Sequence, residues 1–213
     1  MDEEVAKRRK RLEAEPGCSK PDGKAGLNNI LQVAVSLGQQ LEIFGIPYCV
    51  IGGVAVQRWG EPRQTVDVDA TLLTGFGCEE SAIERLLSQF NSRIDNPHEF
   101  ALQNRILLLK SPKGTDIDLS FGALPFEERL IERSSEWPVP RHGIIRTCSA
   151  EDLVVLKAFA SRPQDWIDVE KVIIRQGQRL NRHLIVEELT PLAELKEDPE
   201  ILEHLQSLLL KHP

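Results

Sequence analysis

The stretch RQTVDVDATLL, residues 63–73, combines a strand pattern with two aspartates at alternate positions. Apolar and polar residues alternate along it, and this period of two predicts a β-strand at about 65–73. Because side chains two positions apart lie on the same face of a strand, Asp67 and Asp69 are expected side by side. Neighbouring carboxylates repel one another unless a cation lies between them, so this strand predicts a cation-binding face.

Composition places the chain among globular proteins. Its 213 residues are 41% hydrophobic and 28% charged, and a chain of this length can bury a core of its own. The formal net charge of −7 disfavours binding along a nucleic-acid duplex, although a local basic cleft stays compatible with it. No apolar run reaches the roughly 18 residues that a membrane span needs, so we expect a cytoplasmic protein without a membrane partner.

The cysteines give no disulfide or metal pattern. Cys18, Cys49, Cys78 and Cys148 are scattered, without a CxxC pair and without a histidine at metal-ligand spacing. Reduced thiols are therefore expected.

Three segments differ in pattern. Residues 1–26 are rich in charge and then in glycine and proline, so we expect a flexible N-terminal segment; its basic cluster at 7–11 belongs to a solvated helix or contacts RNA. Residues 27–135 alternate helix and strand patterns. Helix patterns dominate residues 136–213, which predicts a sheet-bearing core followed by a helical C-terminal domain. Strands are expected at 48–53, 65–73, 100–111 and 115–121, the last two as a hairpin around SPKG.

Two glycines end the apolar stretch YCVIGG, residues 48–53. At the start of a helix, the backbone N–H groups of Gly52 and Gly53 suit a phosphate, although a tight turn explains a glycine pair more often. The aspartate strand follows, and the acidic strand TDIDLS, residues 115–120, comes later. Carboxylates suit Mg²⁺ or Mn²⁺, and phosphates beside such ions favour two-ion phosphoryl transfer.

A lysine interrupts the apolar helix expected at 149–162. Ser149 and Asp152 have the spacing of a capping box, so the helix is expected to begin near Ala150. Lys157 is the one polar residue between positions 153 and 160. It requires an anion within reach, or it extends its stem outward to solvent.

The stretch IGGVAVQRWGEPRQTVDVDATL, residues 51–72, resembles the Gly-Gly, Arg-x-Thr-x-Asp-x-Asp signature of the DNA polymerase β-like nucleotidyltransferase superfamily. The pattern is most similar to the AbiEii and minimal nucleotidyltransferase groups of bacterial toxin–antitoxin systems. The resemblance implies an α+β fold: a small mixed β-sheet nucleotidyltransferase core with flanking helices, followed by a helical C-terminal half. It also implies an NTP donor, Mg²⁺ or Mn²⁺, and transfer of a nucleoside monophosphate.

The resemblance assigns a role to each matching residue. It places Gly52 and Gly53 at the phosphate, Asp67 and Asp69 at the metal, and Arg63 and Thr65 at polar positions of the nucleotide site. Asp118, between two apolar residues, fits the third metal carboxylate better than Asp116, which becomes a supporting or merely solvated acid. Lys157 and Arg162 are expected at the triphosphate, with Asp165 and Asp168 orienting them.

Three functions from different classes stay open. The first is a nucleotidyltransferase that acts on RNA, for example the 3′ end of a tRNA, on a protein side chain or on a small molecule. The second is a non-catalytic binding partner with the same fold, such as an antitoxin that holds a cognate toxin. The third is a metal-dependent phosphodiesterase, which the Gly-Gly pair before the acids disfavours. The complete set of acids with Lys157 favours the first.

Overall fold

The structure is a computed structural model that describes residues 23–75 and 77–213. The basic cluster at 7–11 and nearly all of the N-terminal segment expected at 1–26 lie outside the described residues. The elements follow one another as α2 (Gly23–Phe44), β1 (Tyr48–Val50), α3 (Gly52–Trp59), β2 (Asp67–Leu72), α4 (Glu79–Leu87), β3 (Asn91–Ser92), α5 (Pro97–Asn104), β4 (Ile106–Lys110), β5 (Asp116–Phe121), α6 (Pro125–Glu132), β6 (Ser135–Val139), β7 (Gly143–Thr147), α7 (Ala150–Ala160), α8 (Pro163–Gln176), the 3₁₀ turn η1 (Gly177–Arg179), α9 (Arg182–Leu195) and α10 (Glu200–Lys211).

The strands form one mixed sheet in the order β3-β4-β5-β2-β1-β7-β6. Strand β2 runs antiparallel to β1 and parallel to β5, and β4 and β5 form the expected hairpin. The parallel pairing of β2 with β5 brings the two acidic strands of the sequence into direct contact. The expected fold class, an α+β fold with a mixed sheet, flanking helices and a helical C-terminal half, is confirmed.

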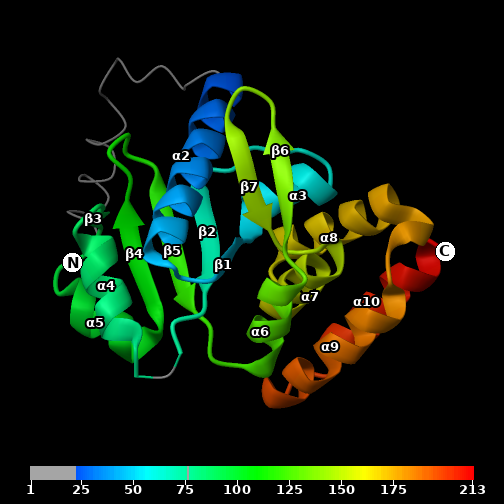
Figure 1. The fold of residues 1–213 in the computed structure, drawn as a ribbon. Helices are drawn as coiled ribbons and strands as arrows, with labels where there is room; N and C mark the ends of the chain where they lie inside the picture. Colours follow the sequence, from blue (N-terminus) through cyan, green and yellow to red (C-terminus); the bar gives the residue numbers. More distant parts are fainter. Residues whose placement is uncertain (1–22, 76) are drawn as a thin grey trace, which may run out of the picture.

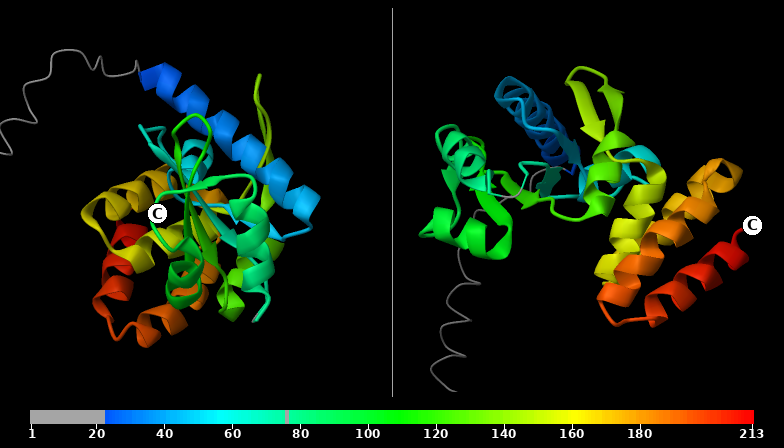
Figure 2. Two further views of the ribbon diagram at one scale, coloured as in Figure 1. Left: turned by 90° about the vertical axis from the view of Figure 1, so that its left-hand side faces the viewer. Right: turned by 60° about the horizontal axis from the view of Figure 1, so that its bottom comes forward.

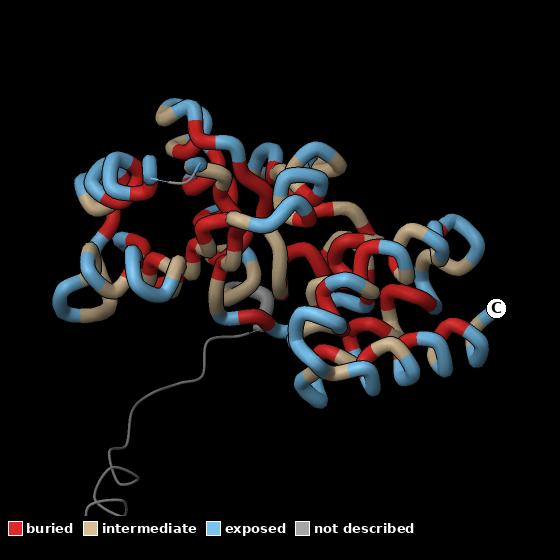
Figure 3. The backbone as a smooth tube through the Cα atoms, turned by 90° about the horizontal axis from the view of Figure 1, so that it is seen from below, coloured by how far each residue is buried: buried red, intermediate tan, exposed pale blue. Residues whose placement is uncertain are grey.

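The elements around the sheet fall into a sheet-bearing part and a helical part. Helix α2 lies across one face of the sheet, with α4 and α5 beside β3 and β4, whereas α7 to α10 gather at the opposite side of the molecule (Figure 1). The right-hand view of Figure 2 gives the same separation. Two clusters of buried residues correspond to these parts, and α3 contributes to both, with Val54 in the first and Val56 in the second. The backbone coloured by burial shows the helices α7 to α10 alternating between buried and exposed turns (Figure 3).

Two features of the sheet differ from the expectation. Residues 100–104 belong to helix α5 and not to a strand, which begins only at Ile106. The segment 135–147 forms the hairpin β6–β7, which extends the sheet through a parallel pairing of β7 with β1. The sheet thus continues beyond residue 135, where we expected it to end.

The expected helices of the C-terminal half are present. Helix α7 begins at Ala150, and the side chain of Ser149 accepts a hydrogen bond from the backbone N–H of Asp152, which confirms the expected cap. In the described part of the chain, no helix combines the length and apolar character of a membrane span.

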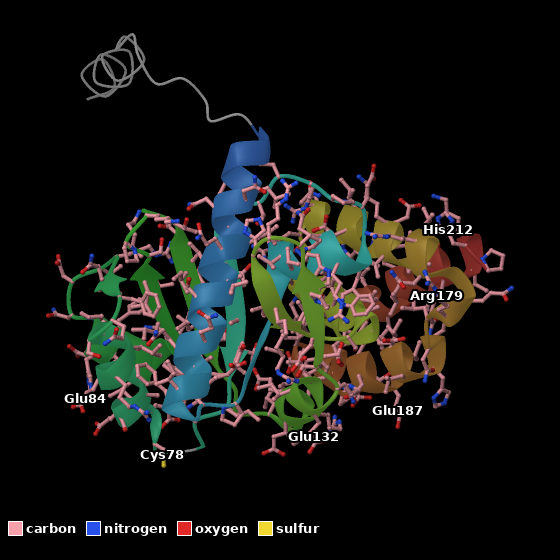
Figure 4. The ribbon with its side chains drawn as sticks, turned by 45° about the horizontal axis from the view of Figure 1, so that its top comes forward. Cys78, Glu84, Glu132, Arg179, Glu187 and His212 are labelled. Atoms are coloured by element: carbon pink, nitrogen blue, oxygen red, sulfur yellow. The ribbon has the colours of Figure 1, made fainter. Side chains whose placement is uncertain are left out.

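The described cysteines form no disulfides. Cys49 and Cys148 are buried free thiols, whereas Cys78 is exposed and lies at the edge of the molecule (Figure 4). Cys18 lies outside the described residues.

Candidate active site

The parallel register of β2 and β5 brings four aspartates together. Asp67 lies opposite Asp116, and Asp69 lies opposite Asp118. Alternate residues of both strands, such as Val68, are fully buried in the core that includes α2. Because successive side chains point to opposite faces, the four carboxylates share the face away from α2.

Asp69 is the most strongly perturbed of these acids. Burial, together with the negative charges of Asp67 and Asp118, raises its pKa to about 6. The positive charge of Lys157 and a hydrogen bond from the backbone of Gly53 oppose this rise only in part. A cation bound beside Asp69 would relieve the repulsion that raises the pKa.

The glycine pair allows α3 to begin directly against the acids. Gly52 has a φ of +59°, and a Cβ atom there would lie 1.9 Å from Oδ2 of Asp69. A Cβ atom on Gly53 would lie 2.2 Å from Oγ1 of Thr65. Glycine is required at both positions because these side chains fill the space. The pair therefore approaches Asp69 on β2 and Thr65 in the loop just before that strand.

The loop before β2 is fixed from two sides. Thr65 is buried, and its hydroxyl donates to Oδ1 of Asp67 at 3.0 Å. Arg63 donates from Nε and Nη2 to the two carboxylate oxygens of Asp168, each at 2.8 Å. Such a planar two-point contact fixes the arginine more firmly than a single bond. It joins the loop to helix α8.

Lys157 forms ion pairs inside the protein. Its Nζ lies 2.7 Å from Oδ1 of Asp165 and 3.1 Å from Oδ2 of Asp168. Asp165 also binds Nε of Arg162 at 2.7 Å. Burial raises the pKa of Asp168, but hydrogen bonding to Arg63 and the charge of Lys157 outweigh it and leave the pKa below its ordinary value. Three cations thus share two buried carboxylates, an excess of one positive charge.

A cleft of about 490 Å³ unites these groups. Three of its lining residues are acids, called here the acidic wall: Asp67, Asp69 and Asp118. Three others are cations, called here the basic wall: Arg63, Lys157 and Arg162. Gly53, Thr65 and Asp165 also line the cleft, whereas Gly52, Asp116 and Asp168 lie outside its lining. The remaining lining residues are Ile51, Gln64, Val66, Ile106, Ser120 and Gln164.

Arg93 is the principal site residue that the sequence did not indicate. Its guanidinium pairs with both acids of β5, with Nη1 at 2.9 Å from Oδ2 of Asp116 and Nη2 against Oδ1 of Asp118. Lys110 binds the other oxygen of Asp116 at 2.9 Å, and these contacts lower the pKa of Asp116. Burial raises the pKa of Asp118, and the charge of Arg93 opposes this only in part. No local pattern linked Arg93 to a strand reached 25 residues later.

The acidic wall fits a hard divalent ion at its β2 end. Among residues 23–75 and 77–213, no group of three or more His, Cys, Asp and Glu side chains could hold a metal ion. Mg²⁺, however, usually binds one or two carboxylates and completes its shell with water and substrate phosphates. Asp67 and Asp69 supply two such oxygens on one face of the cleft. Their chemistry therefore fits an ion that shares its remaining positions with phosphate oxygens.

Neither a family model nor a curated protein matches the sequence. Among solved structures, the chain is similar to an antigenic nucleotidyltransferase-like protein from Paracoccidioides brasiliensis, with 19% identity over 84% of this chain and 93% of that chain and a TM-score of 0.48. It is also similar to the antibiotic-resistance factor ANT(2'')-Ia, with 16% identity over 87% of this chain and 93% of that chain and a TM-score of 0.42. At these identities and TM-scores the likeness carries no argument about function. The functional proposal rests on the residues of the cleft.

Proposed function

We propose that the protein is a nucleotidyltransferase, which transfers a nucleoside monophosphate from an NTP to a hydroxyl group of an acceptor with the help of Mg²⁺ or Mn²⁺. One observation carries the proposal: the acidic wall and the basic wall line the same cleft. A divalent ion and a triphosphate have opposite charges, and this arrangement complements both. The motif resemblance of residues 51–72 points to the same chemistry.

Each wall has a role in the proposed reaction. A divalent ion at Asp67 and Asp69 would neutralise charge on the phosphates. Arg162, whose side chain is 75% exposed, is the cation of the basic wall most accessible to a triphosphate. Lys157, largely buried with Asp165, adds its field to the cleft.

The acceptor oxygen would form a bond to the α-phosphorus as the bond from that phosphorus to the bridging oxygen of pyrophosphate breaks. Pyrophosphate leaves with the electron pair. Asp118, which lines the cleft, would accept the proton of the acceptor hydroxyl. The reaction thus uses an acid on β5 for the acceptor and the pair on β2 for the donor.

The acceptor and the biological setting rest on the motif resemblance. We propose a macromolecular acceptor in the cytoplasm, either RNA such as a tRNA end or a protein side chain, with a small molecule as the remaining option. Membership of a toxin–antitoxin pair of the AbiEii or minimal nucleotidyltransferase type, with a cognate protein partner, belongs to the same proposal.

The decisive experiment is label transfer. The protein is incubated with cell lysate, Mg²⁺ or Mn²⁺ and, in turn, each of the four α-labelled NTPs. We expect one class of macromolecule to acquire label with one preferred NTP, and no label with Asp69→Asn of equal folded fraction. Absence of transfer with every NTP and both metals, from protein that is folded, contradicts the proposal.

A non-catalytic binding partner is the second candidate. It is favoured because some charged side chains of the site are already paired with residues of the chain itself. Lys157 is paired with two aspartates, and Asp118 is paired with Arg93. A binding module would bind NTP or a partner protein without releasing pyrophosphate. Pyrophosphate release measured beside NTP binding separates the two candidates, and release of free nucleoside monophosphate would instead indicate a phosphodiesterase.

A further inference from the structure

Arg93 gives Asp118 a cation from the chain itself. Its backbone N–H donates to the carbonyl oxygen of Leu108 at 3.1 Å, which fixes the start of the side chain beside β4. Leu108 is the register partner of Asp118. The guanidinium passes to Asp116 and Asp118 on the next strand, and its side chain is only 22% exposed. Arg93 is therefore held at both its backbone and its charged end.

The two acidic strands are compensated in different ways. On β5, Asp116 and Asp118 are paired with Arg93, and Asp116 also with Lys110. On β2, Asp67 accepts a bond from the hydroxyl of Thr65, and Asp69 is bonded to the backbone of Gly53. Within the described part of the chain, none of the ion pairs includes either acid of β2. Asp67 and Asp69 on β2 are therefore the acids that would require a cation from outside the chain.

We propose that Arg93 takes the place of a second divalent ion at Asp118, so that the cleft binds one divalent ion, at Asp67 and Asp69. This inference rests on the proposed function and revises its expected two-ion form. A guanidinium keeps its charge at all relevant pH values and has a planar set of donors that matches carboxylates. A divalent ion on the same carboxylate would be repelled by it at short range. Arg93 is thus a positioning residue, and Asp118 stays available to the acceptor.

The test is a Mn²⁺ titration of the full chain without nucleotide, with free Mn²⁺ measured by electron paramagnetic resonance. We expect one Mn²⁺ per wild-type chain. Arg93→Met keeps the aliphatic stem and removes the charge. In this variant we expect a second Mn²⁺ to bind, or the affinity of the chain for Mn²⁺ to rise about tenfold, because the positive charge that repels the ion is absent. Arg93→Lys keeps the positive charge, although not the planar fork, and should keep the stoichiometry at one. Lys110→Met is the matched control, since it removes a cation from Asp116 alone and should leave the stoichiometry at one.

Two wild-type Mn²⁺ ions, or a titration that Arg93→Met does not change, would overturn the inference and leave the proposed function standing. A wild-type chain that binds no Mn²⁺ would overturn the metal-dependent function itself, and this inference with it. Should Arg93→Met fail to fold, Asp118→Asn gives the same answer. One-ion binding predicts an unchanged stoichiometry for that variant, whereas loss of one of two ions contradicts it.

Discussion

Lys157 and Asp165 form a buried ion pair in which Nζ lies 2.7 Å from Oδ1. The apolar surroundings of this lysine in the sequence required an anion or an outward-reaching stem, and the structure provides the anion within the same domain. Oδ2 of Asp168 also lies 3.1 Å from the ammonium nitrogen. The lysine therefore connects helices α7 and α8.

Replacing Lys157 by methionine should lower the free energy of unfolding by about 2 kcal/mol, because two buried carboxylates each lose a contact with the ammonium. The loss stays moderate because Arg63 still pairs with Asp168, and Arg162 with Asp165. The helix sequence alone suggests the opposite, since removing an isolated ammonium from apolar surroundings is neutral or stabilising. Urea unfolding measures the difference. Arg162→Met is the control, because that side chain is 75% exposed and should change stability by well under about 1 kcal/mol. Equal stability of Lys157→Met and wild type would show that the buried pair contributes nothing.

Gly53→Ala should lower the thermal midpoint. Its new Cβ would lie 2.2 Å from Oγ1 of Thr65, and crowding of this kind in a packed site costs about 1–3 kcal/mol. Gly26→Ala, whose Cβ would meet nothing within 4 Å in helix α2, should raise the midpoint through helix propensity. Circular dichroism melts of both variants measure this contrast. A Gly53→Ala protein as stable as Gly26→Ala would mean that Thr65 can move away freely.

The sequence predicted the parts of the fold whose patterns are local. The alternation in β2 and β5 and the apolar faces of α7 to α10 are local signals, and the acids and basic residues they carry meet in one cleft. The hairpin β6–β7 was missed because helix patterns dominate residues 136–213, and Pro138 within β6 is not typical of a strand interior. Strand β6 is at the edge of the sheet, where proline is tolerated.

Helix α5 (Pro97–Asn104), where a strand was expected from residue 100, was missed for a different reason. The helix ends at Arg105, which has a φ of +55°. Glycine is the residue that usually adopts this left-handed conformation at a helix end, so an arginine there gives no sequence signal. The apolar run across this point therefore read as one strand. The pairing of Arg93 with Asp118 could not be predicted, because it depends on how β3, β4 and β5 lie side by side.

Asp69→Asn should stabilise the protein at neutral pH. The pKa of Asp69 is about 6 in the folded state, against an ordinary value of 3.8, so the folded state binds the proton more tightly. The stability that this proton contributes is fully present below about pH 4 and is lost as the pH rises through about 6. The asparagine variant should exceed wild type by on the order of 2 kcal/mol at pH 7, and the gain should vanish near pH 4.

Asp116→Asn is the control of opposite sign. Bonding to Lys110 and Arg93 lowers the pKa of Asp116, so its contribution is present above about pH 4 and is lost as the pH falls further. Its asparagine variant should be less stable than wild type at pH 7. Denaturant midpoints between pH 4 and pH 8 measure both variants. A gain for Asp69→Asn that does not depend on pH would contradict the repulsion we assign to the acidic wall.

Asp67→Asn should weaken Mn²⁺ binding by about tenfold or more, because the ion loses one of two anionic ligands and an amide oxygen is a weaker one. Asp116, the register partner of Asp67 on β5, provides the matched control. Asp116 lies opposite Asp67 in the sheet, yet it is outside the lining of the cleft and is already paired with Arg93 and Lys110. Asp116→Asn removes the same charge one strand away, so a purely long-range effect of charge would weaken both variants alike. We expect a loss confined to Asp67→Asn in calorimetric titrations with Mn²⁺ at pH 7.5; equal losses in the two variants would place the ion away from β2.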